Sequence, residues 1–325
     1  MGFLREYVKS MRLYYSFVTG IAGWIGIACY EYSADLQMLG DGAHAFAAKK
    51  LIILVLAFLG WGINQIVNDY LGLPEDRINA PERPMVTGAL NPRKALLFSG
   101  FLILASVVIT GLFLEPPAIV FLLAGVMMNV LYEKAKGYGA WGNVVFGLMI
   151  CTVTLYGFFA MGPVHGFFWL PYILPLLALL CTINGLMTLY TYFKDYAGDK
   201  RAGKRTLIVI WGLERSRIRA FAGAFLPLSV FVLLRAANEL PVPLGGEFML
   251  LGTLALALQI WTGALFYFKP VGKATYTSLG VNFKACVCSE VALLSLFNPV
   301  VGVRLFVISY LAVTFLFFLH RNAKA

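Results

Sequence analysis

The stretch GWGINQIVNDYLGLPEDRINAPERP, residues 60–84, passes from an apolar helix into a charged loop. Asn64 and Asn68 are four residues apart and therefore lie on one face of a helix, with Asp69 beside them. The proline that follows is expected to end the helix, so that Asp76 comes from a loop that folds back. Ionisable groups at the end of an apolar segment are costly at membrane depth and indicate a functional site.

The chain as a whole is too apolar for a soluble protein. It has 325 residues, of which 60% are hydrophobic and 13% are charged, and its mean hydropathy is +0.79. A soluble domain carries roughly 25% charged residues, so these charges cannot cover a water-facing surface. Long apolar segments predict an all-α polytopic membrane protein and exclude a transmembrane β-barrel.

Ten apolar segments approach the ~20 residues that a helix needs to cross the hydrocarbon core. Segment 281–297 contains Lys284 and Glu290 and is followed by Asn298, so the last two segments could form one broken hairpin. We expect Glu290 to lie near the membrane interface. The prediction is a bundle of 9–10 transmembrane helices around a central cavity. The ten segments are 14–32, 49–71, 95–114, 116–133, 141–162, 168–192, 218–235, 247–268, 281–297 and 302–319.

The net charge of +10 is distributed unevenly along the chain. Both ends and the even-numbered connections carry most of the Lys and Arg residues, whereas the odd-numbered connections carry few. The positive-inside rule then places both termini and the two largest polar loops, after spans two and six, on the cytoplasmic side. The same rule explains the charge without nucleic acid as a partner. We expect an integral, multi-pass protein of a prokaryotic cell membrane.

A second acidic stretch ends span six and reads YTYFKDYAGDKRAGKRTL, starting at Tyr190. Asp195 and Asp199 share a helix face if the helix continues through Gly198, and a turn there would also bring them together. Spans two and six occupy matching positions in two successive four-helix units. This arrangement predicts two pseudo-repeats within a single domain, residues 1–325.

Asp69 and Asp76 form one acidic corner after span two, and Asp195 and Asp199 form a second after span six. With their neighbouring cations, the two corners are expected to face each other and to bind one ligand. Hard oxygen ligands hold Mg²⁺, and Mg²⁺ together with Lys and Arg holds phosphate oxygens. A pyrophosphate group fits between two such corners, and the apolar bundle next to it has room for a long hydrocarbon tail. The partners predicted from these residues are therefore a lipid diphosphate and the bilayer.

The arrangement of these residues resembles the UbiA superfamily of intramembrane prenyltransferases. That family has Asn-Asp-x-x-Asp-x-x-x-Asp after its second helix, often followed by Arg-x-Asn-x-Pro-x-Arg-Pro. The corresponding residues here are Asn68, Asp69, Gly72, Asp76, Arg77, Asn79, Pro81, Arg83 and Pro84. The second family motif, Tyr-x-x-x-Lys-Asp followed by Gly-Asp-x-x-x-Gly, matches Tyr190, Lys194, Asp195, Gly198, Asp199 and Gly203. The stretch YEKAKGYGAWGN, residues 132–143, is similar to the family's segment after helix four.

The resemblance implies Mg²⁺-dependent transfer of a prenyl group from a polyprenyl diphosphate to a lipophilic or aromatic acceptor, by way of an allylic cation. Its motifs imply metal ligands at Asn68, Asp69, Asp76, Asp195 and Asp199. Diphosphate-binding residues are expected at Asn64, Asn68, Arg77, Arg83, Lys136, Lys194 and Arg201. The catalytic set is the four aspartates and Tyr190, whose ring, with that of Tyr192, is expected to stabilise the cation.

Two features depart from the family pattern. Gly72 replaces the middle aspartate, which leaves Glu75, Asn64 or Asn68 to substitute for it, and a tenth span exceeds the nine usual in the family. A terpene cyclase on the same scaffold would keep both corners and let the cation close on itself.

A transporter using the pseudo-repeat for alternating access is a second alternative. The clustering of acids at one membrane face, rather than at the midplane, disfavours it. The acceptor stays open between a phenol, a porphyrin-type ring, a glycerol phosphate and a sugar phosphate, and so does the prenyl length.

Overall fold

The computed structural model of the chain describes residues 2–37, 47–167, 169–272 and 274–322, and these residues are mainly helical. The elements are α1 (Phe3–Met11), η1 (Leu13–Tyr15), α2 (Ser16–Asp35), α3 (Ala47–Leu71), α4 (Leu73–Asn79), α5 (Pro84–Thr87), α6 (Pro92–Phe113), α7 (Ala118–Ala135), β1 (Tyr138–Gly139), α8 (Trp141–Met161), α9 (Leu170–Arg201), β2 (Arg205–Thr206), α10 (Leu207–Trp211), α11 (Leu213–Gly223), α12 (Leu226–Ala236), α13 (Gly246–Phe268), α14 (Ala274–Ser295) and α15 (Pro299–Asn322).

Ten helical segments in the described ranges are long and apolar enough to cross a membrane. They correspond one to one with the predicted spans, and α14 and α15 are two separate helices rather than one broken hairpin. The outward faces are apolar, as a bilayer requires; Leu97 on α6 and Leu233 on α12, for example, are 75% and 67% exposed. The prediction of an all-α, multi-pass membrane fold is confirmed.

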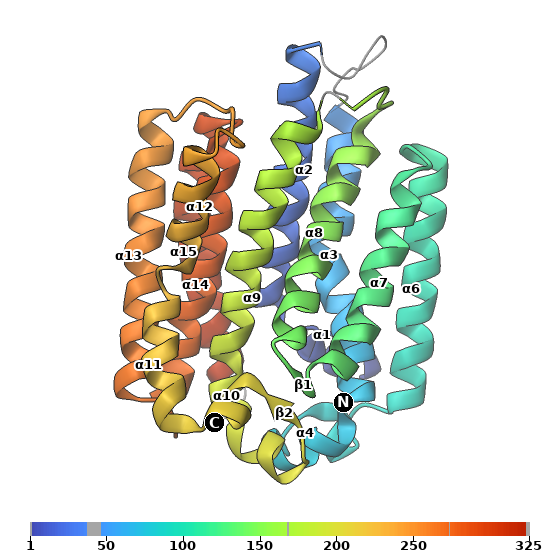
Figure 1. Cartoon of the computed structure of the whole chain (residues 1–325). Helices are drawn as coiled ribbons and strands as arrows, with labels where there is room; N and C mark the ends of the chain where they lie inside the picture. The colour runs from blue at the N-terminus through green and yellow to red at the C-terminus, as the bar shows by residue number, and fades with distance from the viewer. Residues whose placement is uncertain (1, 38–46, 168, 273, 323–325) are drawn as a thin grey trace.

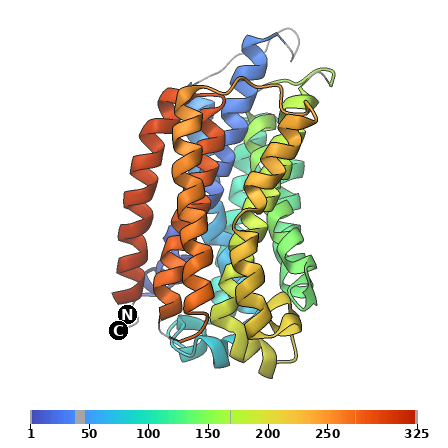
Figure 2. The same cartoon turned by 60° about the vertical axis from the view of Figure 1, so that its left-hand side comes forward.

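Both chain termini lie at the same end of the bundle as α4, α10 and the strand pair β1–β2 (Figure 1). This end carries the large polar loops that follow α3 and α9. Figure 2 shows that most of the long helices run roughly along one direction, with these short elements below them. The expectation that both termini share a side with these loops therefore agrees with the arrangement of the elements.

Small residues allow the central helices α2 and α8 to approach closely. A Cβ atom at Gly26 would overlap the backbone oxygen of Thr154, and one at Gly157 would overlap the backbone oxygen of Gly23. Packing of small residues against a neighbouring backbone is a common way for helices to associate in lipid, where apolar side chains gain little by leaving the hydrocarbon. This contact brings the N-terminal span into the centre of the bundle.

Helix α9 continues through Gly198 and ends at Arg201, so Asp195 and Asp199 share one helix face. Of the two arrangements expected for these residues, the structure has the helix and not the turn. Gly198 allows α4 to approach α9 closely, because a Cβ atom at this position would overlap the side-chain amide of Asn79 on α4. Helix α4 therefore packs directly against α9.

A two-residue parallel strand pair holds the next connection in place. Tyr138 pairs with Arg205 and Gly139 with Thr206, so that the loop after α7 is joined to the loop after α9. The pair fixes Lys136, just before β1, near the end of α9. Local backbone pairing thus brings a cation from one polar loop to the carboxylates of the other.

Glu290 corrects an expectation from the sequence. We expected it near the membrane interface, but α14 begins at Ala274 and Glu290 lies well inside the helix, with its side chain fully buried. One carboxylate oxygen accepts a hydrogen bond of 2.8 Å from Nδ2 of Asn184 on α9. The polar pair joins two helices within the bundle, which explains how α14 tolerates an acidic residue.

Candidate functional site

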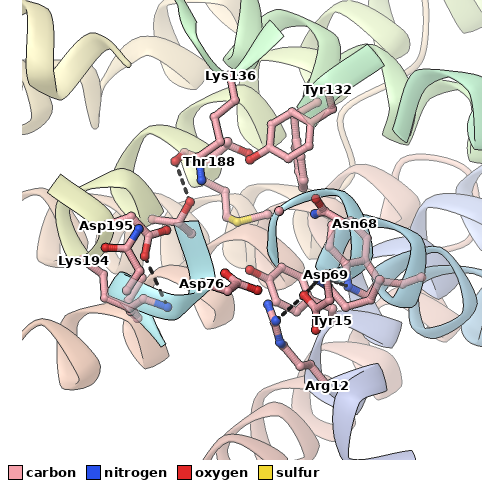
Figure 3. Close-up of a pocket in the computed structure, with 18 of the residues that line it drawn as sticks. Arg12, Tyr15, Asn68, Asp69, Asp76, Tyr132, Lys136, Thr188, Lys194 and Asp195 are labelled. Atoms are coloured by element: carbon pink, nitrogen blue, oxygen red, sulfur yellow. Dashed lines mark hydrogen bonds and ion pairs between the residues drawn. The ribbon is translucent and has the colours of Figure 1, made fainter. Parts of the chain in front are cut away.

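A cavity lies where the acidic ends of α3 and α9 meet (Figure 3). Its lining comes from sequence segments as distant as η1, α4, α7, α14 and α15. In the view of Figure 3, Asp195 lies on one side and Asp69 on the other, with Asp76 between them. The two acidic corners therefore face one shared cavity, as expected from their matching positions in the sequence.

The first corner consists of carboxylates that are paired with arginines. Asp69 Oδ1 accepts hydrogen bonds from Arg12 Nη2 at 2.6 Å and from Gln65 Nε2 at 2.7 Å. Arg83 forms an ion pair with Asp76 and also lies 3.5 Å from Asp69. Charge-assisted contacts of this kind are strong and hold the groups in place. The two carboxylates are thus fixed at the edge of the cavity.

The second corner is less completely paired. Asp195 Oδ1 lies 3.6 Å from Lys194 Nζ, and Asp199 Oδ1 lies 3.7 Å from Lys136 Nζ, both beyond hydrogen-bond distance. Asp195 Oδ1 and both carboxylate oxygens of Asp199 have no hydrogen-bond partner among the described residues. Buried carboxylate oxygens normally have partners, so these atoms point to a ligand such as a cation.

The donor set fits Mg²⁺ bound jointly with a phosphate. Carboxylate and amide oxygens are the ligands that Mg²⁺ prefers. Within the described ranges, no three Asp, Glu, His or Cys side chains lie close enough to hold a metal ion on their own. Mg²⁺ is commonly held by one or two carboxylates plus substrate phosphates and waters. Each corner offers that number of carboxylates, so the cavity is suited to a metal that arrives with its substrate.

Two cations in the polar loops remain charged despite their burial. Burial disfavours the charged form of Arg83. The negative charges of Asp69 and Asp76 have a larger combined effect and raise the pKa of Arg83 above its usual value. The pKa of Lys136 is likewise raised by Asp195 and Asp199, against the effect of burial. For Asp76, burial raises the pKa, and Arg83 opposes the shift. The cavity therefore presents permanent positive charge to an anionic group.

Aromatic rings form the apolar part of the cavity wall. The rings of Tyr15 and Trp61 stack with centroids 4.4 Å apart, and Phe283 meets Tyr15 edge-on at 4.5 Å. Tyr132 packs edge-on against Phe146, with centroids 5.3 Å apart. All five line the same cavity as the acidic corners. Such faces can stabilise a carbocation.

Seven residues predicted for the site line this cavity: Asn68, Asp69, Asp76, Arg83, Lys136, Lys194 and Asp195. Asp199 does not line it. Its side chain is fully buried on the next turn of α9, and Oδ1 lies 3.7 Å from Nζ of Lys136, which does line the cavity. Asp199 is therefore placed to act on the site through that lysine.

Four other predicted positions do not line this cavity. Asn64 donates a hydrogen bond to the Gly60 backbone oxygen and lines a second, mostly apolar cavity among α2, α3, α6, α7 and α8, which Trp61 and Gln65 also border. Arg77 and Arg201 are exposed at the surface. Tyr190 donates to the Ala220 oxygen at 2.8 Å, and its ring stacks on Phe266, away from the cavity.

Several functional candidates were missed from the sequence. The most prominent is Arg12, which precedes Asp69 by 57 residues and reaches it from the turn between α1 and η1. Its φ of 51° is uncommon for a residue other than glycine, and no local pattern signals it. Trp61 and Gln65 could have been found, since they precede Asp69 by eight and four residues and so share its helix face.

Comparisons with known proteins agree with these features. The model of the UbiA prenyltransferase family matches residues 37–286. Digeranylgeranylglyceryl phosphate synthase of Pyrococcus horikoshii is 28% identical over 243 residues, which are 74% of this chain and 79% of that protein. A UbiA homologue from Aeropyrum pernix has a similar fold, with a TM-score of 0.69 at 15% identity over 90% of this chain and 97% of that one. A UbiA homologue from Archaeoglobus fulgidus, solved with DMAPP and Mg²⁺, has a TM-score of 0.60 at 14% identity. The match covers 89% of this chain and 99% of that one.

Proposed function

The chain belongs to the UbiA prenyltransferase family, and we propose from this premise that it transfers a prenyl group, with the help of Mg²⁺, from a prenyl diphosphate to a glycerol-phosphate lipid. The observation that carries the proposal is the convergence of two acidic corners on one cavity. Asp69 and Asp76 on one side and Asp195 on the other are separated by over a hundred residues of sequence, yet they line the same space together with four cations: Arg12, Arg83, Lys136 and Lys194.

The diphosphate would lie between the corners. We assign metal binding to Asp69, Asp76 and Asp195, with Asn68 as a further oxygen ligand, and we assign diphosphate neutralisation to Arg83, Lys136 and Lys194. Asp199 positions Lys136, which it faces at 3.7 Å. When bound, Mg²⁺ supplies positive charge that stabilises the leaving pyrophosphate.

The protein's own residues account for the rest of the reaction. The lysines and arginines hold the departing oxygens, so the carbon–oxygen bond breaks where negative charge is already balanced. The allylic cation that remains faces Tyr15, Trp61 and Tyr132, whose rings line the cavity. The acceptor hydroxyl attacks this carbon, and its proton passes to the released pyrophosphate. The aromatic part of the wall limits the access of water as a competing nucleophile.

The acceptor assignment rests on the relatives and on charge. Several relatives are named digeranylgeranylglyceryl phosphate synthases, at 26–34% identity. One prenyl transfer to make such a product needs geranylgeranylglyceryl phosphate as the acceptor. Arg12, paired with Asp69, adds positive charge to the first corner, and we assign this charge to the phosphate of the acceptor. An aromatic acceptor, which we expected equally from the sequence, has no comparable support.

We further propose that residues 1–325 act as one catalytic unit in a prokaryotic membrane, with the site at the cytoplasmic face. The cavity takes residues from Arg12 near one end of the chain to Phe317 near the other, which favours a single domain. The excess of Lys and Arg in the loops around the site favours the cytoplasmic side. Proteolysis of oriented membrane vesicles at the loop after α9 tests the orientation.

The activity itself can be tested with purified protein, Mg²⁺ and geranylgeranyl diphosphate. We expect pyrophosphate release only when geranylgeranylglyceryl phosphate is added, with a doubly prenylated glycerol phosphate as the product. Release that requires a membrane lipid extract instead would identify a different acceptor. Release without any acceptor, with a cyclic hydrocarbon, would contradict transfer and support a cyclase. The absence of release with any prenyl diphosphate would contradict the proposal altogether.

The aromatic wall leads to a separate prediction. Trp61→Leu is expected to lower kcat about tenfold or more, since a desolvated cation–π contact stabilises a cation by ~2 kcal/mol. Tyr190→Phe removes the hydrogen bonds of the hydroxyl with Ala220 and Gln259, each worth about 1 kcal/mol of stability, and should leave kcat nearly unchanged. Steady-state kinetics and thermal melting of both variants in detergent provide the measurement. A kcat reduced by Tyr190→Phe and not by Trp61→Leu would contradict the corrected assignment.

A further inference from the structure

Gly72 lies in the first corner, where the family pattern has its middle aspartate. Its backbone angles, φ −90° and ψ 10°, are available to any residue, so the backbone does not require glycine here. A Cβ atom at this position would lie 3.6 Å from Oε1 and 3.7 Å from Cδ of Glu133. It would also lie 3.2 Å from the backbone oxygen of Asn68. The space into which a residue 72 side chain would point therefore lies against the Glu133 carboxylate.

Glu133 comes from α7, more than sixty residues further along the chain, and it lines the cavity together with Asp69 and Asp76. Its side chain is 12% exposed, and Oε1 lies 2.5 Å from Lys204 Nζ. Lys204 also contacts Glu75 Oε1 at 3.1 Å and is not itself part of the cavity lining. Lys204 thus holds the carboxylate of Glu133 from outside, while the residue remains accessible from the cavity.

The other carboxylates of this corner each have a cationic partner of their own. Glu75, which the sequence also offered as a substitute for residue 72, lines the cavity too and shares Lys204 with Glu133, so one lysine serves two carboxylates. Asp69 contacts Arg12 and Arg83, and Asp76 contacts Arg83. A divalent cation placed here without another carboxylate would face a corner that is close to neutral. A carboxylate oriented by a second group is the usual form of a metal ligand or of a group that binds a metal through water. Glu133, oriented by Lys204, has this form.

We propose that Glu133 supplies, from α7, the cation-binding carboxylate that residue 72 does not provide on α3. The inference rests on the proposed Mg²⁺-dependent function and adds a residue to its first corner. The absence of a side chain at Gly72 and the presence of an acid at position 133 are two parts of one arrangement. Restoring an acid at position 72 should therefore compensate for losing the acid at position 133.

Binding of Mn²⁺ to the purified full chain, followed by electron paramagnetic resonance with and without inorganic pyrophosphate, tests the proposal without turnover. We expect Glu133→Gln to weaken Mn²⁺ binding at least about tenfold, because even outer-shell partners change metal affinity by this amount. Glu115→Gln is the matched control. Glu115 also pairs with a lysine, Lys49 at 2.6 Å, but it lies in the α6–α7 connection at the other end of the bundle. Its substitution should leave Mn²⁺ binding unchanged.

Two further variants separate a ligand from a simple ion-pair partner. The double variant Gly72→Asp with Glu133→Gln should regain most of the Mn²⁺ affinity, with a small adjustment near the Asn68 oxygen. Lys204→Met should lower the affinity less than Glu133→Gln does, because the loss of the orienting contact is partly offset by the removal of a competing positive charge. If Glu133 serves only to pair with Lys204, Glu133→Gln and Lys204→Met will lower thermal stability alike. Neither variant will then change Mn²⁺ binding, and that result overturns the inference.

Failure of the inference can be told apart from failure of the proposed function. Asp195→Asn should lose Mn²⁺ binding whatever the role of Glu133. Normal binding by Glu133→Gln together with loss in Asp195→Asn overturns the inference alone. A wild-type protein that binds no Mn²⁺, even with pyrophosphate, overturns the Mg²⁺-dependent function and the inference with it.

Discussion

Asp195→Ala is expected to lower pyrophosphate release by about 10³-fold, the scale on which preorganised electrostatic groups act in active sites. Asp195 lines the cavity, and its Oδ1 has no hydrogen-bond partner among the described residues. Its removal therefore deletes a cation ligand without breaking a hydrogen bond of that atom. The protein should remain folded in detergent, as judged by its melting temperature and its elution volume in size-exclusion chromatography.

Asp69→Ala should abolish release as well, but it carries a larger structural cost. Asp69 accepts hydrogen bonds from Arg12 and Gln65, and its loss leaves a largely buried arginine without its partner. Glu31→Gln serves as a control for both variants, because Glu31 pairs with Lys50 at 2.6 Å and does not line the cavity. Turnover retained in a folded Asp195→Ala protein would falsify the assignment of the metal site.

Gly198→Ala should lower kcat by about 10²-fold, since a displacement of ~1 Å at a catalytic group can cost this much. The new methyl group would overlap the Asn79 side-chain amide, and we expect the displaced side chain to push α4 away from α9. Helix α4 carries Asp76, and α9 carries Asp195. A single methyl group therefore separates the two acidic corners, although neither carboxylate is changed.

A double-mutant cycle with Asn79→Ala identifies the cause of this loss. Asn79→Ala removes the atoms that the new methyl group meets, so Gly198→Ala should have a much smaller effect on kcat in that background. Asn79 lines the cavity and its substitution can lower kcat by itself, which is why the comparison is made within each background. Equal effects of Gly198→Ala in both backgrounds would show that the clash with α4 is not responsible.

The membrane class, the ten spans and the two acidic corners could be predicted from the sequence because they depend on local composition. A run of apolar residues is long enough to cross a bilayer whatever surrounds it. Asp69 and Asp195 end spans in matching positions, and charged loops around them indicate which side they share. These properties require no knowledge of how one helix is rotated against another, and each of them agrees with the structure.

The composition of the cavity wall could not be predicted, and α3 shows why. The sequence suggested that Asn64 and Asn68 both face the site, yet only Asn68 lines the site cavity, together with Trp61, Gln65 and Asp69. Asn64 lines a second cavity, which Trp61 and Gln65 also border. In a soluble helix, polar residues mark the outer face. A helix within a membrane is apolar on nearly all sides, so its sequence does not show which face turns towards the centre.

The sequence by itself therefore determined that this chain is a multi-pass membrane protein with two acidic corners suited to Mg²⁺ and a diphosphate. Only the tertiary structure decided that Arg12 and Glu133 join the first corner and that Tyr190 does not reach the cavity. The physical reason is the distance along the chain. Contacts between residues tens of positions apart depend on how helices pack and rotate, and in lipid that packing is set by small residues and shape rather than by a hydrophobic pattern.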